Sequence, residues 1–141
     1  MLLPKKVKHR KWQTARMSMA RRLTVKETRG TEISFGAYGL KSISFGRITS
    51  NQLESARKVV SRTIGKTGKL WIRVFPDRPF TVKAAQVPMG NGKGDPEGYC
   101  TEIKSGRVLF EVDGVAKEIA MEALRKGGAK LPVKTKILAR E

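Results

Sequence analysis

Residues 49–76, TSNQLESARKVVSRTIGKTGKLWIRVFP, join a helical pattern directly to a strand pattern and so indicate the fold class. Thr49 and Gln52 have the spacing of a capping box, which begins a helix, and Gly65 supplies a stop for it. The run 70–75 is rich in β-branched and aromatic residues, which is typical of a strand, and it ends before Pro76. The apolar stripe of the predicted helix, at helical spacing, consists of Leu53, Ala56, Val60 and Ile64.

Further strand patterns lie on both sides of this stretch. Residues 32–48 alternate with the period of a strand and are interrupted by glycines, so they predict two short strands or one bent strand. Residues 81–87 are compatible with another strand. Residues 99–103 and 107–112 predict the two strands of a hairpin, joined by residues 104–106.

A second helix is predicted after Asp113 and Gly114, where a turn precedes a helical pattern that ends at a glycine pair, 127–128. Residues 131–138 predict a last strand, and Pro132 suits the edge of a sheet because proline donates no ladder hydrogen bond. Strands and two helices in mixed order indicate an α+β domain. The apolar stripe of the second helix is Ile119, Ala120, Ala123 and Leu124.

The composition points to a polyanionic partner. The chain has 141 residues, the length of one domain, and 30 Lys and Arg against 12 Asp and Glu give a formal net charge of +18. Nucleic acid is therefore the first candidate partner and an anionic membrane surface the second. No apolar run approaches the roughly 20 residues that cross a bilayer. With one cysteine, Cys100, and one histidine, His9, we expect neither an internal disulfide nor a metal site.

The positive charge is concentrated at the beginning of the chain. Residues 1–26 carry nine basic groups and no acid, whereas residues 95–123 are net acidic. We therefore predict a basic, extended RNA-binding arm over residues 1–31, followed by a single domain over residues 32–141. An organellar transit peptide is less favoured, because the dense Lys and Arg leave little apolar face. The candidate RNA-binding cations of the arm are Lys5, Lys6, Lys8, Arg10, Lys11, Arg16, Arg21 and Arg22.

The outer face of the first helix adds three further cations, Arg57, Lys58 and Arg62. Charge clustering of this kind favours RNA contact and an ordinary solvated face about equally. Trp12 lies among the arm cations with no apparent core around it, so we expect its ring to stack on a base or to anchor the arm on RNA. For Trp71 and Phe75, packing in a core is the favoured role, because strand aromatics usually pack there.

A glycine-rich loop is predicted over residues 88–98 and contains GNGKG at 90–94. It is not a P-loop, because that motif requires Ser or Thr after the lysine and then a helix, whereas Gly94 and Asp95 follow Lys93. Two roles stay open: an ordinary flexible surface loop, or a mobile tip whose lysine approaches a nucleic-acid backbone. Cys100 lies in a predicted strand as a small buried hydrophobe, and other catalytic groups are wanting, so we expect no enzyme and no cofactor.

Several segments, taken in order, resemble the large-subunit ribosomal protein L-sixteen family of bacteria and organelles from end to end. The resemblance implies an α+β domain with a mixed, mostly antiparallel sheet backed by two helices. It also implies a non-catalytic place in the large ribosomal subunit, where the partners are large-subunit rRNA, neighbouring ribosomal proteins and tRNA at the aminoacyl site, and a role in late subunit assembly. The segments are MLLPKKVKHRKWQ (1–13), SFGAYGLK (34–41), GKLWIRVFPDRP (68–79), PMGNGKG (88–94), VLFEVDGV (108–115) and KLPVKTK (130–136).

By the same resemblance, the glycine-rich loop approaches the aminoacyl-site tRNA with Met89, Gly90, Asn91, Gly92, Lys93 and Gly94. Pro88 and Asn91 stand where the family usually has basic residues, so this loop has two fewer cations. Residues 17–31 are longer than the family's usual junction between arm and domain. We expect a bacterial cytoplasmic ribosome, with an organellar ribosome second, and neither a membrane nor a small-molecule substrate as partner. The alternative function is a free basic RNA-binding module that does not enter ribosomes.

Overall fold

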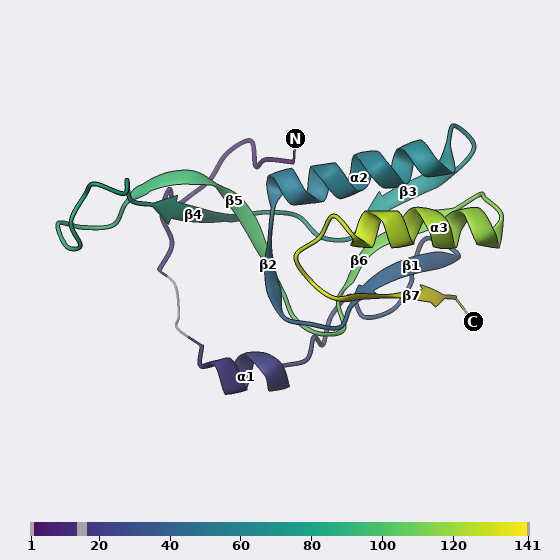
Figure 1. Cartoon of the computed structure of the whole chain (residues 1–141), viewed down its shortest axis with the longest axis horizontal. Helices are drawn as coiled ribbons and strands as arrows, with labels where there is room; N and C mark the ends of the chain where they lie inside the picture. The colour runs from purple at the N-terminus through teal and green to yellow at the C-terminus, as the bar shows by residue number, and fades with distance from the viewer. Residues whose placement is uncertain (1, 14–16, 141) are drawn as a thin grey trace.

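A computed structural model of the chain describes residues 2–13 and 17–140 (Figure 1). Its strands form two sheets, a four-stranded sheet in the order β3-β6-β1-β7 and a three-stranded sheet in the order β2-β5-β4, and every neighbouring pair is antiparallel. Two long helices, α2 and α3, lie side by side over one face of the four-stranded sheet, which confirms the α+β prediction (Figure 1). The elements are α1 (Met19–Thr24), β1 (Tyr38–Ser42), β2 (Gly46–Thr49), α2 (Ser50–Ile64), β3 (Lys69–Ile72), β4 (Arg78–Val82), β5 (Asp95–Ile103), β6 (Val108–Asp113), α3 (Lys117–Gly128) and β7 (Thr135–Ala139).

The predicted hairpin between residues 99–103 and 107–112 is wrong, because β5 and β6 belong to different sheets. The connection between these strands contains one long turn hydrogen bond, from the Arg107 N–H to the Lys104 carbonyl at 3.4 Å, and its shorter hydrogen bonds go to other segments. The Gly106 N–H donates to the Ser42 carbonyl at 2.7 Å, and the Glu27 N–H donates to the Ser105 carbonyl at 2.7 Å. Residues 32–48 divide in the same way, giving β1 to one sheet and β2 to the other. These two crossings between the sheets, after β1 and after β5, therefore lie next to each other, and the chain also crosses through α2 and between β3 and β4.

The core lies between the two long helices and the four-stranded sheet. α2 begins at the predicted capping box, in which the Thr49 N–H donates to Gln52 Oε1 at 2.9 Å and the Gln52 N–H donates to Thr49 Oγ1 at 3.4 Å. α2 and α3 approach closely at Gly127, where a Cβ atom would lie 2.4 Å from Val60 Cγ2. A larger residue there would force the helices apart. The predicted stripe of the first helix is buried as expected: Leu53, Ala56, Val60 and Ile64.

The prediction for the second helix needs two corrections. Ile119 is not part of the apolar stripe, since 43% of its surface is exposed. The glycine pair 127–128 does not stop the helix but forms its last turn, and both residues are buried. They are buried because this turn packs on α2 and on the sheet, where only a hydrogen atom fits. Ala120, Ala123 and Leu124 are buried as predicted.

The strand expected over residues 81–87 lies earlier, as β4. β4 pairs with β5 as far as Val82 opposite Asp95, so β5 includes the last residues of the predicted loop 88–98. β7 lies at the edge of the four-stranded sheet, as the preceding Pro132 indicated, although it begins only at Thr135.

The region predicted to be an extended arm contains the short helix α1. The Ser18 hydroxyl caps this helix by accepting the Arg21 N–H at 3.3 Å, and the sequence MARRLT is rich in good helix formers. Near the beginning of the arm, Leu2 packs against the core, and its carbonyl accepts the Ser50 hydroxyl at 2.7 Å. The arm is thus held against the first turn of α2 before its cations begin.

Candidate nucleic-acid interface

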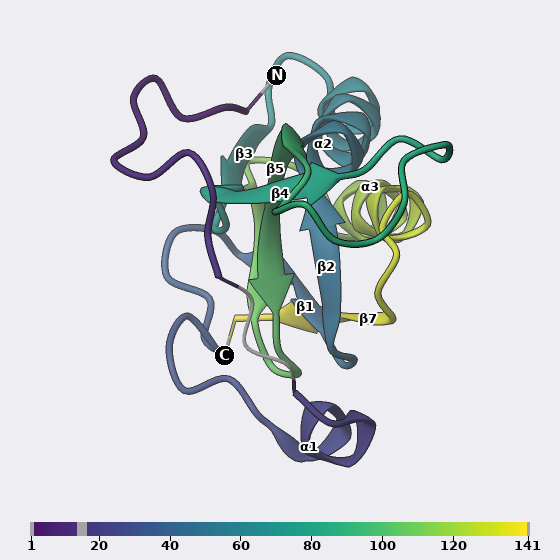
Figure 2. The ribbon, with the colours of Figure 1, turned by 90° about the vertical axis from the view of Figure 1, so that its left-hand side faces the viewer.

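The first cations of the arm point into solvent. Lys5, Lys6, Lys8 and Arg10 are exposed, and Figure 2 shows this stretch looping out from the body of the domain. Among the described cations over residues 2–13, Lys11 alone lies within ion-pair distance of a carboxylate. The others have no carboxylate partner among the described residues and are open to phosphate. Arg16, also predicted to bind RNA, lies outside the described residues.

The arm meets the glycine-rich loop at Lys11 and Trp12. Lys11 Nζ donates to the Lys93 carbonyl at 3.0 Å and lies 3.8 Å from a carboxylate oxygen of Asp95. In return, the Lys93 ammonium donates to the Trp12 carbonyl. The Trp12 side chain is exposed beside these contacts. Two segments that were predicted separately, the arm and the loop, therefore share one surface.

The loop between β4 and β5 lies at the tip of a hairpin that projects from the rest of the molecule (Figure 1). The Lys83 ammonium crosses the loop and donates to the carbonyls of Pro88, at 3.5 Å, and Gly90. Met89 is 92% exposed at the tip. The loop thus presents backbone, the apolar side chains of Val87 and Met89, and the Lys93 stem. Three successive residues have left-handed φ angles of 105°, 52° and 88°, which glycine and asparagine tolerate best: Gly90, Asn91 and Gly92.

The outer face of α2 is less uniformly basic than its sequence indicates. The Arg57 guanidinium forms two hydrogen bonds with the Glu54 carboxylate, at 2.9 and 2.7 Å, so its charge is paired. The hydrogen bond from Arg57 also holds the pKa of Glu54 below its usual value. Lys58 and Arg62 are exposed. These two are the members of the predicted trio that a phosphate can reach without breaking an ion pair.

The two predicted cations of α1 lie in different surroundings. Arg21 is exposed, whereas Arg22 is half-buried with its guanidinium carbon 5.7 Å from the centre of the Phe45 ring. A cation over an aromatic face is attracted to it, so Arg22 helps to hold α1 on the domain. Arg21 is left as the cation of this helix that faces solvent.

A buried carboxylate, which the sequence patterns did not single out, organises the sheet face away from the helices. Glu111 in β6 is fully buried, and its carboxylate accepts the N–H groups of Ser34 (3.2 Å), Phe35 (2.6 Å) and Gly36 (2.9 Å). The Arg73 guanidinium donates to the same carboxylate. Burial acts to raise the pKa of Glu111, but the hydrogen bonds outweigh it, and the pKa lies below its usual value. The available signal was an acid inside the apolar run 108–112.

Trp71 and Phe75 do not pack in the core as expected. Ile72 and Val74 take the core side, so the residues that alternate with them face outward. Phe75 is 47% exposed. Trp71 is half-buried, and its ring stacks on Phe35 with the ring centres 6.2 Å apart and an interplanar angle of 19°.

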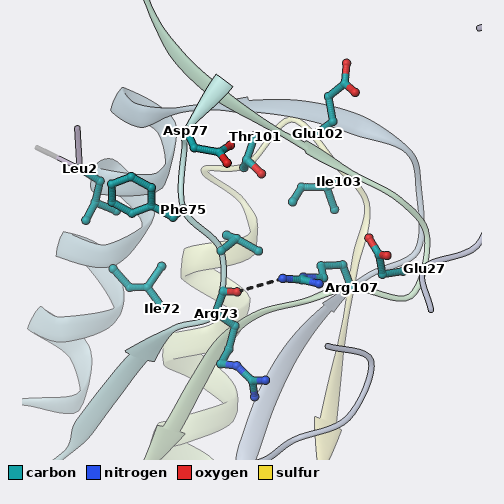
Figure 3. Close-up of a pocket in the computed structure, with 11 residues that line it drawn as sticks. Leu2, Glu27, Ile72, Arg73, Phe75, Asp77, Thr101, Glu102, Ile103 and Arg107 are labelled. Carbon is teal, nitrogen blue, oxygen red and sulfur yellow. Dashed lines mark hydrogen bonds between the residues drawn. The ribbon is translucent and has the colours of Figure 1, made fainter. Parts of the chain in front are cut away.

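A cavity of about 560 Å³ lies beside the end of β3, between this strand and β5 (Figure 3). Figure 3 shows the Arg107 guanidinium directed at the Arg73 carbonyl, which accepts it at 3.5 Å, while the Arg73 side chain points away. Arg107 also donates to the Arg29 carbonyl at 2.7 Å. The Arg107 guanidinium is thus already hydrogen-bonded within the protein. Three acids also line the cavity, so it does not offer a basic site for RNA. These acids are Glu27, Asp77 and Glu102.

Within residues 2–13 and 17–140, no three His, Cys, Asp or Glu side chains are grouped so as to hold a metal ion. No helix in the same described part of the chain is long and apolar enough to cross a membrane. Cys100 is buried in β5, and this burial raises the pKa of its thiol. Its burial agrees with the role of a small hydrophobe.

A family model described as ribosomal protein L16p/L10e matches residues 4–138 of the chain. The matched range takes in the cations of the arm, both long helices and the glycine-rich loop. It therefore includes each of the basic surfaces described above.

Proposed function

Since the chain belongs to the ribosomal protein L16p/L10e family, a family of the large ribosomal subunit, we propose that it binds large-subunit rRNA through its arm and α2. The proposal extends to the glycine-rich loop, which contacts tRNA at the aminoacyl site. Neighbouring large-subunit ribosomal proteins complete the set of partners, and a role in late subunit assembly follows from the same resemblance. The proposed location is a bacterial cytoplasmic ribosome, with an organellar ribosome as the second possibility.

The observation that carries this proposal is the set of solvated cations. The net charge is +18, and the described arm cations ahead of Lys11 have no carboxylate partner in the structure. Such unpaired charges repel one another unless a polyanion lies among them, and each phosphate they neutralise releases a counterion. Lys58 and Arg62 on α2 extend the same property to the domain.

The assignment of tRNA to the loop is supported by shape and by the arm–loop contacts. The hairpin of β4 and β5 projects from the domain (Figure 1), and its tip includes three glycines, Gly90, Gly92 and Gly94, so a nucleic-acid backbone can approach it closely. Lys11 and Lys93 place two ammonium groups at this tip from different segments. A ligand at the tip therefore meets the arm as well as the loop.

Salt dependence tests the electrostatic part of the proposal. If the arm and α2 neutralise about eight phosphates, log K for rRNA binding falls with log salt at a slope of roughly −6 to −7. The measurement is a filter-binding titration of the full chain on large-subunit rRNA over a range of salt concentrations. A slope shallower than about −2 corresponds to few neutralised phosphates and would remove the electrostatic argument.

Charge reversal tests whether α2 is part of the interface. Lys58→Glu with Arg62→Glu should weaken rRNA binding without unfolding the protein, because both side chains are exposed. The matched control reverses two exposed cations of α3, Lys117 and Arg125. If the α3 reversal weakens binding as much as the α2 reversal, the protein binds through net charge alone, which is the behaviour of a free basic module.

Co-sedimentation distinguishes the two functions directly. A large-subunit protein stays with the subunits when they are pelleted in high salt, because many contacts must break together for it to leave. A free basic module dissociates, because its binding depends on phosphate neutralisation alone. Loss of the protein from washed subunits would therefore favour the alternative.

A further inference from the structure

The face of the four-stranded sheet that the helices leave open is partly crossed by residues 32–36. Ile33 packs on Gly39 of β1, where a Cβ atom would lie 2.9 Å from Ile33 Cγ1. The next three N–H groups, of residues 34–36, all donate to Glu111 of the neighbouring strand β6. This short segment therefore has its backbone fixed against the sheet.

Phe35 projects from this fixed segment. Its side chain is 57% exposed, its ring stacks on Trp71, and the Arg73 guanidinium carbon lies 4.9 Å from the ring centre. Trp71 and Arg73 are two residues apart along one strand ladder, which continues past β3 through the Arg73 N–H to the Leu109 carbonyl. Alternate residues of a strand point to the same side, so both support the ring from the sheet. The high exposure leaves the outer part of the ring to solvent.

The position of this ring depends on an arrangement that hydrophobic burial does not explain. A buried carboxylate is unfavourable unless it is paired and hydrogen-bonded, and Glu111 has four donor groups around it. This network holds the Phe35 side chain at the surface of the protein and not in the core. An aromatic surface that is already ordered loses little conformational freedom when a flat partner stacks on it.

The same sheet face carries further cations, which extend from β3 at one edge to β7 at the other. Trp71 pairs with Glu111, Glu111 with Gly39, and Gly39 with Leu138, so these four positions form one row across the open face. Residues two positions before or after this row along each strand point to the same face. One of them is an acid, Asp113, which lies opposite Lys69 in the pairing of β6 with β3. The exposed cations at such positions are Lys69, Lys136 and Arg140.

We propose that this open face is a second RNA-binding surface, on which an unpaired base stacks on Phe35 while phosphates of the same strand of RNA lie on the cations across the face. We call it the sheet platform, made of Phe35, Trp71, Arg73, Lys69, Lys136 and Arg140. An unpaired base fits because its flat face is accessible, whereas the bases of a duplex are covered by their neighbours. The inference rests on the proposed function, since it names a further contact with RNA.

The test compares Phe35→Leu with wild type in binding to an unstructured single-stranded RNA of about 12 nucleotides, a length within the usual site size. Loss of one stacked base should weaken binding about tenfold. Because leucine removes no charge, the slope of log K against log salt should stay unchanged, whereas Lys136→Ala should make it shallower by about 0.7. Phe35→Tyr keeps a flat ring and should restore the affinity.

Phe75→Leu is the matched control, since this aromatic is also exposed but lies outside the platform. Equal RNA affinity of Phe35→Leu and wild type would overturn the inference, as would an equal loss for Phe75→Leu. A shift in melting temperature without a loss of affinity would show that the ring only covers the sheet. If wild type itself binds neither this RNA nor rRNA, the proposed function fails instead, so the two failures are distinguishable.

A second measurement does not depend on any variant folding. Ultraviolet irradiation of the wild-type complex with the same RNA, followed by digestion with trypsin, should give a nucleotide adduct on the peptide of residues 30–41. This peptide contains Phe35. Adducts confined to the arm peptides would overturn the inference, because they would place the unpaired bases elsewhere.

Discussion

Replacement of Glu111 by glutamine is expected to destabilise the protein strongly although the two side chains have nearly the same shape. The carboxylate accepts three backbone N–H groups and the Arg73 guanidinium while fully buried. A glutamine amide keeps one acceptor oxygen and turns an NH₂ group toward donors that it cannot satisfy. It also leaves the Arg73 charge, whose side chain is 18% exposed, without its partner.

The magnitude follows from these losses. Removing one member of a buried ion pair costs about 3–5 kcal/mol, because the remaining charge stays desolvated. For a chain of 141 residues, an unfolding entropy of about 2.1 cal/mol/K per residue gives roughly 0.3 kcal/mol/K. The melting temperature of Glu111→Gln should therefore fall by about 10–17 °C.

Thermal unfolding followed by circular dichroism at neutral pH measures this change. Glu122→Gln is the control, because it makes the same chemical change at the ion pair of Glu122 with Lys126 on the surface of α3, where the atoms are 2.8 Å apart, and it should leave the melting temperature almost unchanged. Adding Arg73→Met to Glu111→Gln should recover part of the loss, since it removes the orphaned charge. A fall of less than about 3 °C for Glu111→Gln, corresponding to about 1 kcal/mol, would refute the reasoning.

Three further outcomes are expected. Folding lowers the Glu111 pKa, so the ionised carboxylate stabilises the fold fully above the unfolded value of 4.5, and this stabilisation is lost as the pH falls through the lower folded value. The urea midpoints of wild type and Glu111→Gln should therefore converge as the pH is lowered below 4.5. A gap between the midpoints that widens on acidification would contradict this. Thr49→Ala removes the cap of α2 and should lower the free energy of unfolding, measured in urea, by about 1 kcal/mol. An unchanged free energy of unfolding would mean that the capping box contributes nothing to stability. Lys93→Ala should impair tRNA binding by assembled subunits and leave the melting temperature of the free protein unchanged; the reverse pattern would make the loop structural.

Local signals in the sequence predicted those parts of the fold that local interactions form. α2 was predictable because its cap, its apolar stripe and its stop all lie within 17 residues, at 49–65. The partners of β5 and β6 were not, because the hydrogen bonds that separate these strands come from Ser42 and Glu27, far away in the chain. β4 begins earlier than predicted and contains Pro79, which is tolerated because β4 lies at a sheet edge.

The same division applies to the candidate interface. Exposure of the arm cations followed from charge density alone, and the pairing of Arg57 with Glu54 at a spacing of three residues could have been anticipated from helix geometry. The meeting of Lys11 with Lys93 could not, since it depends on how the hairpin of β4 and β5 lies beside the arm. Residues 32–48 were predicted as strand, but Phe35 lies ahead of β1 with its ring exposed. Nothing in the local sequence indicates that Glu111 holds its backbone.

The four-stranded sheet cannot be completed until the chain has been synthesised as far as residue 139. Its inner strand β1 needs β6, which begins at Val108, and β7, which ends at Ala139. The arm cations over residues 5–11 are made long before these partners, at a time when the apolar side chains of α2 have no sheet to cover. A nascent chain that is both basic and uncovered binds RNA and other chains indiscriminately. Sheet order thus sets an interval during biosynthesis in which the apolar side of α2 stays uncovered.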